Sequence, residues 1–373
     1  MFDWETHAAR LADEVAHPLS RWHGPLATTP RHVFVPRWWQ GRELVEGAAD
    51  PERWMRTAYE NASLVTRVGP LHADHATAED RPEGLPTSSS TLPGLVVGMY
   101  RHAMIGEDSR VLVTTGSGYG TALACKRLGD ERVTSVDVDP YLVGAATERL
   151  DSIGLRPTVR VCDITGELPG EYDRIVSTVS VRRVPVSWLT ALLPGGRLVT
   201  TLADTGLIVS ADKLPDGGAF GRVELDGAGF MVTRHGEDYP PGPGEMFDEV
   251  RGLEGEEVHT GRYPVLDVRE SWDVWSMLSL TVPGVEHRYE EGPDRRRTAW
   301  MVHADGSWAR AEGRWTDPPT VHQGGPRRLW DELERIRHRL NVEGGLPVYG
   351  AAVRIYPDGR LLLKRGAWSA AVE

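Results

Sequence analysis

Hydrophobic and polar residues follow two different patterns along the chain, and the change lies near residue 235. Before it, short apolar runs alternate with stretches of about ten residues in which apolar positions recur at helical spacing. The apolar runs predict strands at 110–114, 133–138, 159–162, 174–178 and 197–202. The periodic stretches predict helices at 92–104, 120–128, 140–150 and 187–193. Strands that alternate with helices in this way indicate βαβ units and a parallel sheet.

The flanking segments are patterned differently. A helix is expected from Asp3, which can cap it, to about Ala16, and an extended segment is expected over 29–39 because two prolines interrupt it. Residues 72–90, polar and rich in Pro and Gly, predict a loop that ends in a serine cluster. Three closely spaced β-like runs, which predict an antiparallel edge to the sheet, lie at 207–210, 221–225 and 230–233.

Beyond residue 235 a connecting segment rich in Gly, Pro and acidic residues extends to about residue 262. We expect β-like runs at 273–281 and 298–303, a turn at 304–306, a helix at 326–340 and a β pair around Pro357 and Gly359. The pattern therefore predicts two domains: a catalytic domain over 1–235 and an appended α+β module over 236–373. We expect this accessory module to recognise a peptide substrate.

The composition of the chain argues against several classes of function. The net charge is −12, whereas a nucleic-acid binder needs a basic surface to neutralise phosphates. The two cysteines, Cys125 and Cys162, have no disulfide or zinc spacing, and no apolar run approaches the roughly 18 residues of a membrane span. The first residues form no signal-peptide pattern. We expect a cytoplasmic, monomeric protein that binds neither nucleic acid nor membrane.

Candidate chemistry begins at a glycine-rich turn between the first strand and its helix. The segment Thr115-Gly116-Ser117-Gly118-Tyr119 would let backbone N–H groups approach a nucleotide cofactor closely. Asp137 ends the next strand, about 20 residues on, where a carboxylate can accept hydrogen bonds from both ribose hydroxyls. Asp163 ends the third strand and could accept from an adenine amino group, although a simple loop aspartate is an equal alternative.

Two cofactor classes use such a turn. A nicotinamide dehydrogenase typically has Gly-x-Gly-x-x-Gly, whereas this turn places glycines at 116, 118 and 120. The LxPGGRL element at 193–198 is typical of S-adenosylmethionine enzymes with a seven-stranded sheet, so S-adenosylmethionine is the favoured cofactor and S-adenosylhomocysteine the product. The fold class expected is α/β: a Rossmann-like, seven-stranded class I methyltransferase sheet with the C-terminal module appended.

Together these elements resemble the protein L-isoaspartate O-methyltransferases over roughly residues 5–235. Pro93 and Met99 match that family's active-site segment, and this match implies that Thr91 holds the active-site hydroxyl, assisted by Ser89 and Ser90. The resemblance implies cofactor contacts from the glycine turn (Thr115 to Tyr119) and from Asp137, Val138, Asp163, Ile164 and Thr178. It implies substrate contacts from Tyr59, Asn61, Thr66, Val68 and Ser88.

The chain departs from the family's pattern in four ways. The approach to the glycine turn, Val113-Thr114-Thr115, is one residue shorter and lacks the family's acidic residue, and the active-site hydroxyl belongs to Thr instead of Ser. Residues 70–86 resemble an insertion, and the small repair enzymes have no C-terminal module. His72, Asp74 and His75 are close in sequence, but a solvated polar loop is the favoured interpretation and no metal site is expected.

The serine cluster before Pro93, the segment 30–39 and the tail motif 321–330 resemble a subgroup that accompanies ATP-grasp ligases in ribosomal peptide (graspetide) clusters. That resemblance implies esterification of an Asp carboxylate in a peptide that the ligase has cyclised, followed by aspartimide formation. An isoaspartate repair methyltransferase is the alternative enzyme. A catalytically inactive peptide-binding protein is the alternative from another class, because the segment 113–115 is altered.

Overall fold

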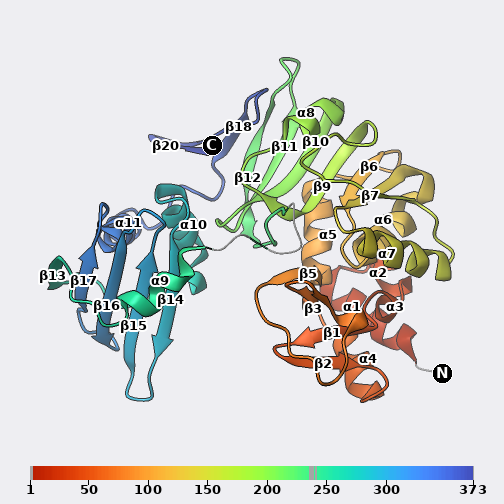
Figure 1. Ribbon diagram of the computed structural model, residues 1–373. Helices are drawn as coiled ribbons and strands as arrows, with labels where there is room; N and C mark the ends of the chain where they lie inside the picture. The colour runs from red at the N-terminus through yellow and green to blue at the C-terminus, as the bar shows by residue number, and fades with distance from the viewer. Residues whose placement is uncertain (1–2, 235–238, 240–241, 373) are drawn as a thin grey trace.

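A computed structural model describes residues 3–234, 239 and 242–372 (Figure 1). Its main sheet has ten strands in the order β20-β19-β18-β12-β11-β10-β9-β6-β7-β8. Seven of these strands come from one continuous stretch of chain: β6 (Val111–Thr114), β7 (Val133–Asp137), β8 (Thr158–Val161), β9 (Tyr172–Val181), β10 (Leu192–Leu202), β11 (Leu207–Lys213) and β12 (Ala219–Gly227). The five neighbouring strands β10, β9, β6, β7 and β8 are parallel. Strand β11 pairs antiparallel with β10, and β12 pairs antiparallel with β11.

Helices cover both faces of the parallel strands. They are α5 (Pro93–His102), α6 (Tyr119–Leu128), α7 (Pro140–Ser152) and α8 (Val186–Ala191), with a short 3₁₀ helix η2 (Asp130–Arg132) before β7. The two helix layers pack on opposite faces of the sheet because alternate side chains of β6 point to opposite faces. Val111 and Val113 belong to the core shared with α5 and α6. Leu112 points the other way, into the core that contains Trp188 of α8. The predicted βαβ order is therefore present.

A second, smaller sheet precedes this layer in the chain. Its strands, in the order β2-β1-β3-β4 with β5 paired to β3, are β1 (Arg37–Gln40), β2 (Glu43–Glu46), β3 (Leu64–Val68), β4 (Leu71–His72) and β5 (Pro86–Ser90). The helices around it are α1 (Trp4–Val15), α2 (His23–Thr28), α3 (Arg31–Phe34), α4 (Pro51–Ala58) and the 3₁₀ turn η1 (Ala73–His75). Asp3 caps α1 as expected, by accepting a hydrogen bond from Thr6 N–H at 3.3 Å.

Three expectations for the chain before residue 235 are wrong. The serine cluster is a strand and not the end of a loop, because Ser88, Ser89 and Ser90 pair with β3. The segment 29–39 is extended only in part, since Pro30 begins the helical turn α3 before the chain enters β1. The 230–233 segment also forms no strand: Val232 makes one isolated bridge to Ser180, and the chain then crosses the end of β9.

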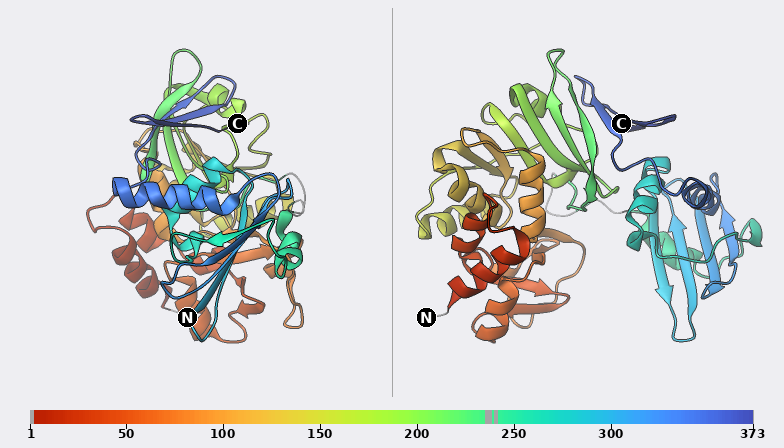
Figure 2. Two further views of the ribbon diagram at one scale, coloured as in Figure 1. Left: turned by 90° about the vertical axis from the view of Figure 1, so that its left-hand side faces the viewer. Right: turned by 180° about the vertical axis from the view of Figure 1, so that it is seen from behind.

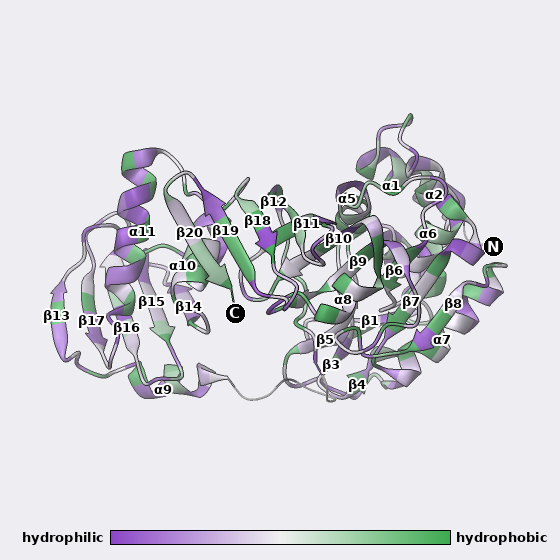
Figure 3. Cartoon of the chain, turned by 90° about the horizontal axis from the view of Figure 1, so that it is seen from above, coloured by the Kyte–Doolittle hydropathy of each residue, from purple (hydrophilic) through white to green (hydrophobic). Residues whose placement is uncertain are grey.

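The C-terminal module lies beside the main sheet (Figures 1 and 2). Its antiparallel sheet, in the order β13-β17-β16-β15-β14, contains β13 (Glu257–Thr260), β14 (Glu286–Glu291), β15 (Arg296–Val302), β16 (Trp308–Arg314) and β17 (Thr320–Gly324). Its helices are η3 (Pro243–Glu245), α9 (Met246–Val250), η4 (Val268–Glu270), α10 (Trp272–Thr281) and α11 (Leu329–Glu343). Helix α11 is mostly hydrophilic (Figure 3) and buries Leu329, Trp330, Leu333 and Ile336.

The segment 273–281 is helix α10, where a β-like run was expected. Val274, Met277 and Leu278 follow helical spacing, but the small residues Ser276 and Ser279 are buried as well. A helix that is buried on most sides shows little polar periodicity, which explains the wrong expectation.

The expected boundary at 235/236 also needs correction. The last strands, β18 (Ala352–Ile355), β19 (Leu361–Arg365) and β20 (Trp368–Val372), return to the main sheet, where β18 pairs with β12. The sheet therefore has ten strands instead of seven, and the module is an insertion between β12 and β18. Sequence patterning shows a β pair but not the strand with which it pairs.

Helix α10 joins the module to the main sheet. Ser276 Oγ donates a hydrogen bond to the carbonyl of Thr205, and a Cβ added at Gly206 would lie 2.7 Å from the Trp272 ring. One hydrophobic core continues from Leu207 and Val223 of the sheet to Leu278 of α10 and Trp330 of α11. No helix in the described residues is long and apolar enough to cross a membrane.

Candidate cofactor and acceptor site

A cavity of about 300 Å³ lies where the carboxyl ends of β6, β7, β8 and β9 meet strand β5. Open α/β sheets bind ligands at this end of their strands. The wall contains the predicted residues Ser88, Ser89, Thr91, Gly116, Asp137, Val138, Asp163, Ile164 and Thr178. Further wall residues, which the sequence reasoning missed, include Ser63, Leu92, Leu95, Thr114, Leu142, Cys162 and Val179.

The glycine turn brings two parts of the site together. Gly116 has a φ of +50°, a conformation that favours glycine, and a Cβ added there would lie 3.3 Å from the carbonyl oxygen of Ser89. The turn after β6 therefore lies directly against the hydroxyl-bearing strand β5. Gly116 N–H also donates to Asp137 Oδ2 at 3.0 Å, so the turn, the acidic residue and the hydroxyl strand form one unit.

Asp137 is the last residue of β7, and its carboxylate faces the cavity. Oδ1 accepts a hydrogen bond from Asp139 N–H at 3.0 Å, and Oδ2 accepts from Gly116 N–H. Burial raises the pKa of Asp137, whereas these two backbone donors lower it. Each carboxylate oxygen keeps a free lone pair, so the group can accept two further hydrogen bonds from a ligand.

Asp163 and Ile164 follow β8 and form the adjoining wall. Asp163 Oδ1 accepts hydrogen bonds from the backbone N–H and the hydroxyl of Thr165, at 2.8 Å and 2.7 Å. The indole of Trp188 donates to the carbonyl of Ile164 at 2.7 Å. The core helix α8 thereby fixes the position of this loop.

The three proposed active-site hydroxyls occupy different environments. Thr91 and Ser89 line the cavity, whereas Ser90 is buried outside it and its Oγ has no hydrogen-bond partner among the described residues. Thr91 and Ser89 therefore remain candidates for contact with an acceptor, and Ser90 does not line the cavity.

Four predicted cofactor residues form the framework of the turn and do not line the cavity. Thr115 Oγ1 is 2.6 Å from Ser135 Oγ, and Ser117 is buried. Gly118, with a φ of +90°, lies against Ala146, and Tyr119 is buried beside Phe34. Of the turn residues 115–119, Gly116 is the one that lines the cavity.

Four predicted substrate residues contact other parts of the protein and do not line the cavity. The hydroxyl of Tyr59 lies 2.7 Å from His32 Nδ1, and burial raises the pKa of Tyr59. Asn61 Oδ1 accepts from Gly94 N–H at 2.8 Å, in the first turn of α5. Thr66 donates to Ser88 Oγ at 3.1 Å, and Val68 is buried in an apolar cluster. Of the predicted substrate set, Ser88 alone lines the cavity.

Arg31 is a central residue that sequence reasoning missed. It is fully buried, and its guanidinium donates to the carbonyls of Ala58, Glu60 and Ala62 at 3.1, 2.6 and 2.8 Å. It also donates to the carbonyls of Ser90 and Thr91, each at 3.4 Å. Burial lowers the pKa of Arg31 to about 10. This side chain therefore fixes the backbone that carries Thr91.

The far wall of the cavity is formed by residues 229–234 and Tyr239. Ser180, at the end of β9, holds this segment: its N–H donates to Met231 O at 2.8 Å, and its hydroxyl donates to Phe230 O at 2.9 Å. The apolar residues of 230–233 predict a strand, but here they form a wall across the strand ends with one isolated bridge, Ser180 to Val232.

His72 is buried and Asp74 is half-buried, so the expectation of a solvated loop is wrong for these two residues. His72 Nε2 lies 3.0 Å from Asp139 Oδ2, which also pairs with Arg67 at 3.2 Å, and Asp74 pairs with Arg149. Burial by itself would raise the pKa of Asp139, but His72, the Tyr141 N–H and Arg67 lower it to about 2. No group of potential metal ligands was found within the described ranges.

Comparison with known proteins decides the family. The model of the family "Protein-L-isoaspartate(D-aspartate) O-methyltransferase" matches residues 75–221, from the segment before β5 to β12. A protein-L-isoaspartate O-methyltransferase from Thermococcus onnurineus is 30% identical over 201 residues, which are 52% of this chain and 89% of that protein. The chain belongs to the protein-L-isoaspartate O-methyltransferase family.

Other similarities place the chain within that family's wider fold. A ribosomal protein L11 methyltransferase from Symbiobacterium thermophilum is 33% identical over 189 residues, 43% of this chain and 60% of that protein. A solved structure titled protein-L-isoaspartate O-methyltransferase has a TM-score of 0.50 at 18% identity, over 99% of this chain and 98% of the other. The chain spans 60% and 64% of the first two curated relatives.

The family assignment also bears on the C-terminal module. The fold similarity to the solved protein-L-isoaspartate O-methyltransferase extends over almost all of this chain, module included.

Proposed function

We propose that the protein is an S-adenosylmethionine-dependent protein carboxyl O-methyltransferase. The observation that carries this proposal is the direct contact between the glycine turn and the hydroxyl strand, since Gly116 lies against the carbonyl of Ser89. A nucleotide-binding turn and an acceptor-orienting strand therefore border one cavity. Membership of the protein-L-isoaspartate O-methyltransferase family supports the same activity.

The cavity wall suits the proposed cofactor. Asp137 would accept from the ribose hydroxyls, and Asp163 with the backbone of Ile164 would border the adenine, with Val138 and Leu142 as apolar neighbours. Gly116 leaves room for close approach at the turn. The shortened segment Val113 to Thr115 supplies no carboxylate for the amino group of a methionine moiety, so contacts there must come from other wall residues.

The chemistry requires positioning more than proton transfer. Bound S-adenosylmethionine supplies an electrophilic methyl group on a sulfonium. An Asp carboxylate is already ionised at neutral pH, and one of its oxygens forms the new C–O bond in line with the departing sulfur. Thr91 and Ser89 can orient that carboxylate by donating hydrogen bonds. Such positioning lowers a barrier by up to about 7–11 kcal/mol.

We infer further that the acceptor is an Asp side chain of a ribosomal peptide that an ATP-grasp ligase has cyclised. The serine cluster before Pro93, the segment 30–39 and the tail motif 321–330 support this acceptor, because they resemble the subgroup found in graspetide clusters. The methyl ester makes the side-chain carbonyl electrophilic. The following backbone nitrogen then attacks that carbonyl, methanol leaves, and an aspartimide results.

Repair of isoaspartate is the second candidate, and the names of the curated relatives favour it. The two acceptors can be separated by mass spectrometry with two peptides, an isoaspartyl peptide and an Asp-containing peptide cyclised by an ATP-grasp ligase. Our proposal predicts that the cyclised peptide gains one methyl group and then loses methanol, at a rate well above that of the isoaspartyl peptide. The reverse preference would assign the protein to repair. Cofactor binding without a mass gain in either peptide would favour an inactive binding protein.

A further inference from the structure

A second cavity, of about 400 Å³, lies in the C-terminal module at the outer edge of its sheet. Strand β14 is the last strand in the order β13-β17-β16-β15-β14, so only one of its edges is paired. No backbone hydrogen bond within the described chain joins the outer edge of β14 to another segment. An unpaired edge of this kind is a template for an additional strand.

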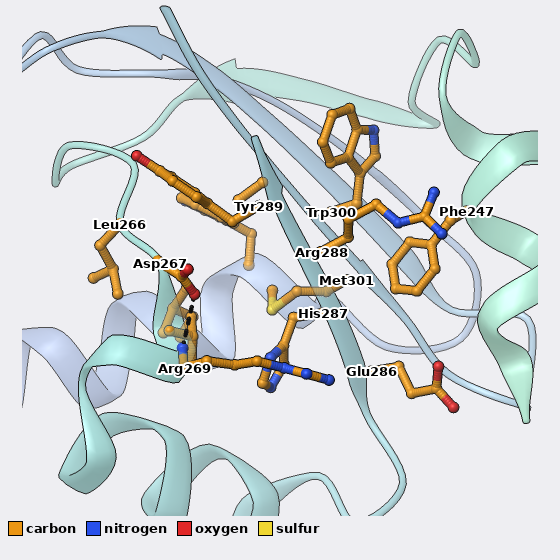
Figure 4. A pocket seen from close by; sticks show the side chains of 14 residues that line it. Phe247, Leu266, Asp267, Arg269, Glu286, His287, Arg288, Tyr289, Trp300 and Met301 are labelled. Atoms are coloured by element: carbon orange, nitrogen blue, oxygen red, sulfur yellow. Dashed lines mark hydrogen bonds between the residues drawn. The ribbon is translucent and has the colours of Figure 1, made fainter. Parts of the chain in front are cut away.

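The cavity borders both faces of β14. His287 and Tyr289 point to one face, where they lie beside Met301 and Ala299 of β15. Arg288 points to the other face, beside Trp300 and Phe247. Figure 4 shows Tyr289 and Leu266 on one side of the strand and Trp300, Arg288 and Phe247 on the other. A peptide added to this edge would place alternate side chains against these two groups.

The cations of the cavity have different surroundings. Arg288 pairs with Asp248 at 3.5 Å and lies 4.6 Å from the centre of the Phe247 ring. Arg269 is exposed, and in the part of the chain that the structure describes its guanidinium makes no ion pair or hydrogen bond. Its backbone N–H caps the turn by donating to Asp267 Oδ1 at 3.0 Å, which holds the residue beside β14 (Figure 4).

The remaining titratable groups leave Arg269 available for an anion. Burial, and then the charge of Arg269, lower the pKa of His287 to about 4, so this ring is neutral at pH 7. The Asp267 carboxylate already accepts the cap hydrogen bond. Glu286 lies against Gly242, where an added Cβ would be 2.3 Å from its Oε1. Burial raises the pKa of Glu286 and the nearby charge of Arg269 lowers it, but the two side chains form no ion pair in the described chain. On the Tyr289 face, Arg269 is therefore the cation that makes no ion pair or hydrogen bond among the described residues, with Glu286 as its acidic neighbour on β14.

The β14 edge is also placed appropriately for a methyl acceptor. Strand β14 lies on the side of the module that faces the catalytic domain, whereas β13 lies on the far side (Figures 1 and 2). Helix α10 fixes this orientation through Ser276 and the Trp272 ring, which contact Thr205 and Gly206.

We propose that an acidic, extended segment of the acceptor peptide adds to the outer edge of β14, with one carboxylate bound by Arg269. An apolar side chain next to that carboxylate would enter the aromatic side of the cavity, against Phe247 and Trp300. The inference rests on the proposed function only in that the bound segment belongs to the peptide that is methylated.

The test measures peptide binding directly, apart from methyl transfer. Fluorescence anisotropy would follow a labelled 12-residue peptide of alternating Asp and Leu, and a second peptide with Asn in place of Asp, on the full-length protein. Arg269→Glu should weaken binding of the Asp peptide roughly tenfold or more and leave the Asn peptide unchanged. Arg335→Glu is the matched control, because it makes the same charge change on the exposed side of α11 and should have no effect.

Backbone methylation of the probe tests the strand geometry. Only alternate N–H groups of an added strand face β14, so N-methylation of one alternate set should weaken binding roughly tenfold and methylation of the other set should not. Equal effects of the two sets, equal affinity of wild type and Arg269→Glu, or no binding up to about 1 mM would overturn the proposal. Binding with these signatures but without methyl transfer to any acceptor would overturn the proposed function and leave the β14 site in place.

Discussion

Substitution of Gly116 by Ala should impair turnover far more than stability. At a φ of +50°, Ala costs about 1–2 kcal/mol relative to glycine. Its Cβ would also lie 3.3 Å from the carbonyl oxygen of Ser89, which is tight enough to displace β5 by a few tenths of an ångström. Strand β5 leads directly to Thr91, and displacements of about 1 Å at a reacting group can cost 100-fold in rate. We expect kcat to fall roughly 10- to 100-fold.

Gly118 provides a matched control. It has a φ of +90°, so Ala is strained there too, but its Cβ would lie 3.0 Å from Ala146 Cβ and 3.3 Å from Phe34, away from the cavity. Gly118→Ala should therefore lower the free energy of unfolding by about 2–4 kcal/mol and leave kcat of the folded fraction within a few-fold of wild type. Urea unfolding and steady-state methyl transfer measure the two effects. Equal loss of kcat in both variants would refute the argument that Gly116 positions the hydroxyl strand.

Three further outcomes are expected. Asp137→Ala should weaken S-adenosylmethionine binding about 10- to 100-fold by calorimetry, because a buried acceptor is lost; unchanged affinity would exclude the ribose role. Arg31→Met should lower the free energy of unfolding by about 3–5 kcal/mol, since its buried carbonyl partners lose their donor, and a loss under 1 kcal/mol in urea would contradict this. The pKa of Asp139, about 2, lies below the unfolded value of 3.8, so its contribution is complete above pH 3.8 and is lost as the pH falls toward 2. Asp139→Asn should therefore remove about 2 kcal/mol of the stability change over this range, measured by urea unfolding, and an identical pH dependence in the variant would disprove the coupling.

Much of the central sheet could be predicted from the sequence because its signals are local. Buried apolar runs of four to six residues mark β6, β7, β9 and β10, and a helical period follows each of the first three. The same order of strands places Gly116, Asp137 and Asp163 at one end of a parallel sheet, where the structure indeed brings them to one cavity.

What the sequence could not predict depends on long-range contacts. Arg31 binds carbonyls 27 to 60 residues away, and no spacing rule connects such partners. The serines of β5 were expected in a loop because their composition is polar, whereas pairing with β3 makes them a strand. Strands β18 to β20 join the main sheet after an intervening module, which a linear pattern cannot indicate.

The residues that the resemblance to a family indicates fall into two groups in the structure. Thr91 and Ser89 line the cavity, but Tyr59, Asn61 and Val68 support the framework around it. A motif match identifies a segment, and the alternation or turn geometry within that segment then decides which side chain faces the ligand.

Thr91 is proposed to orient an acceptor carboxylate beside the cofactor cavity. Single-turnover formation of the base-labile methyl ester tests this role, measured for wild type, Thr91→Ser and Thr91→Ala at saturating S-adenosylmethionine. We predict that Thr91→Ala lowers the rate about 100-fold, that Thr91→Ser retains most of it, and that all three proteins bind the cofactor equally. An unchanged rate in Thr91→Ala would contradict the account.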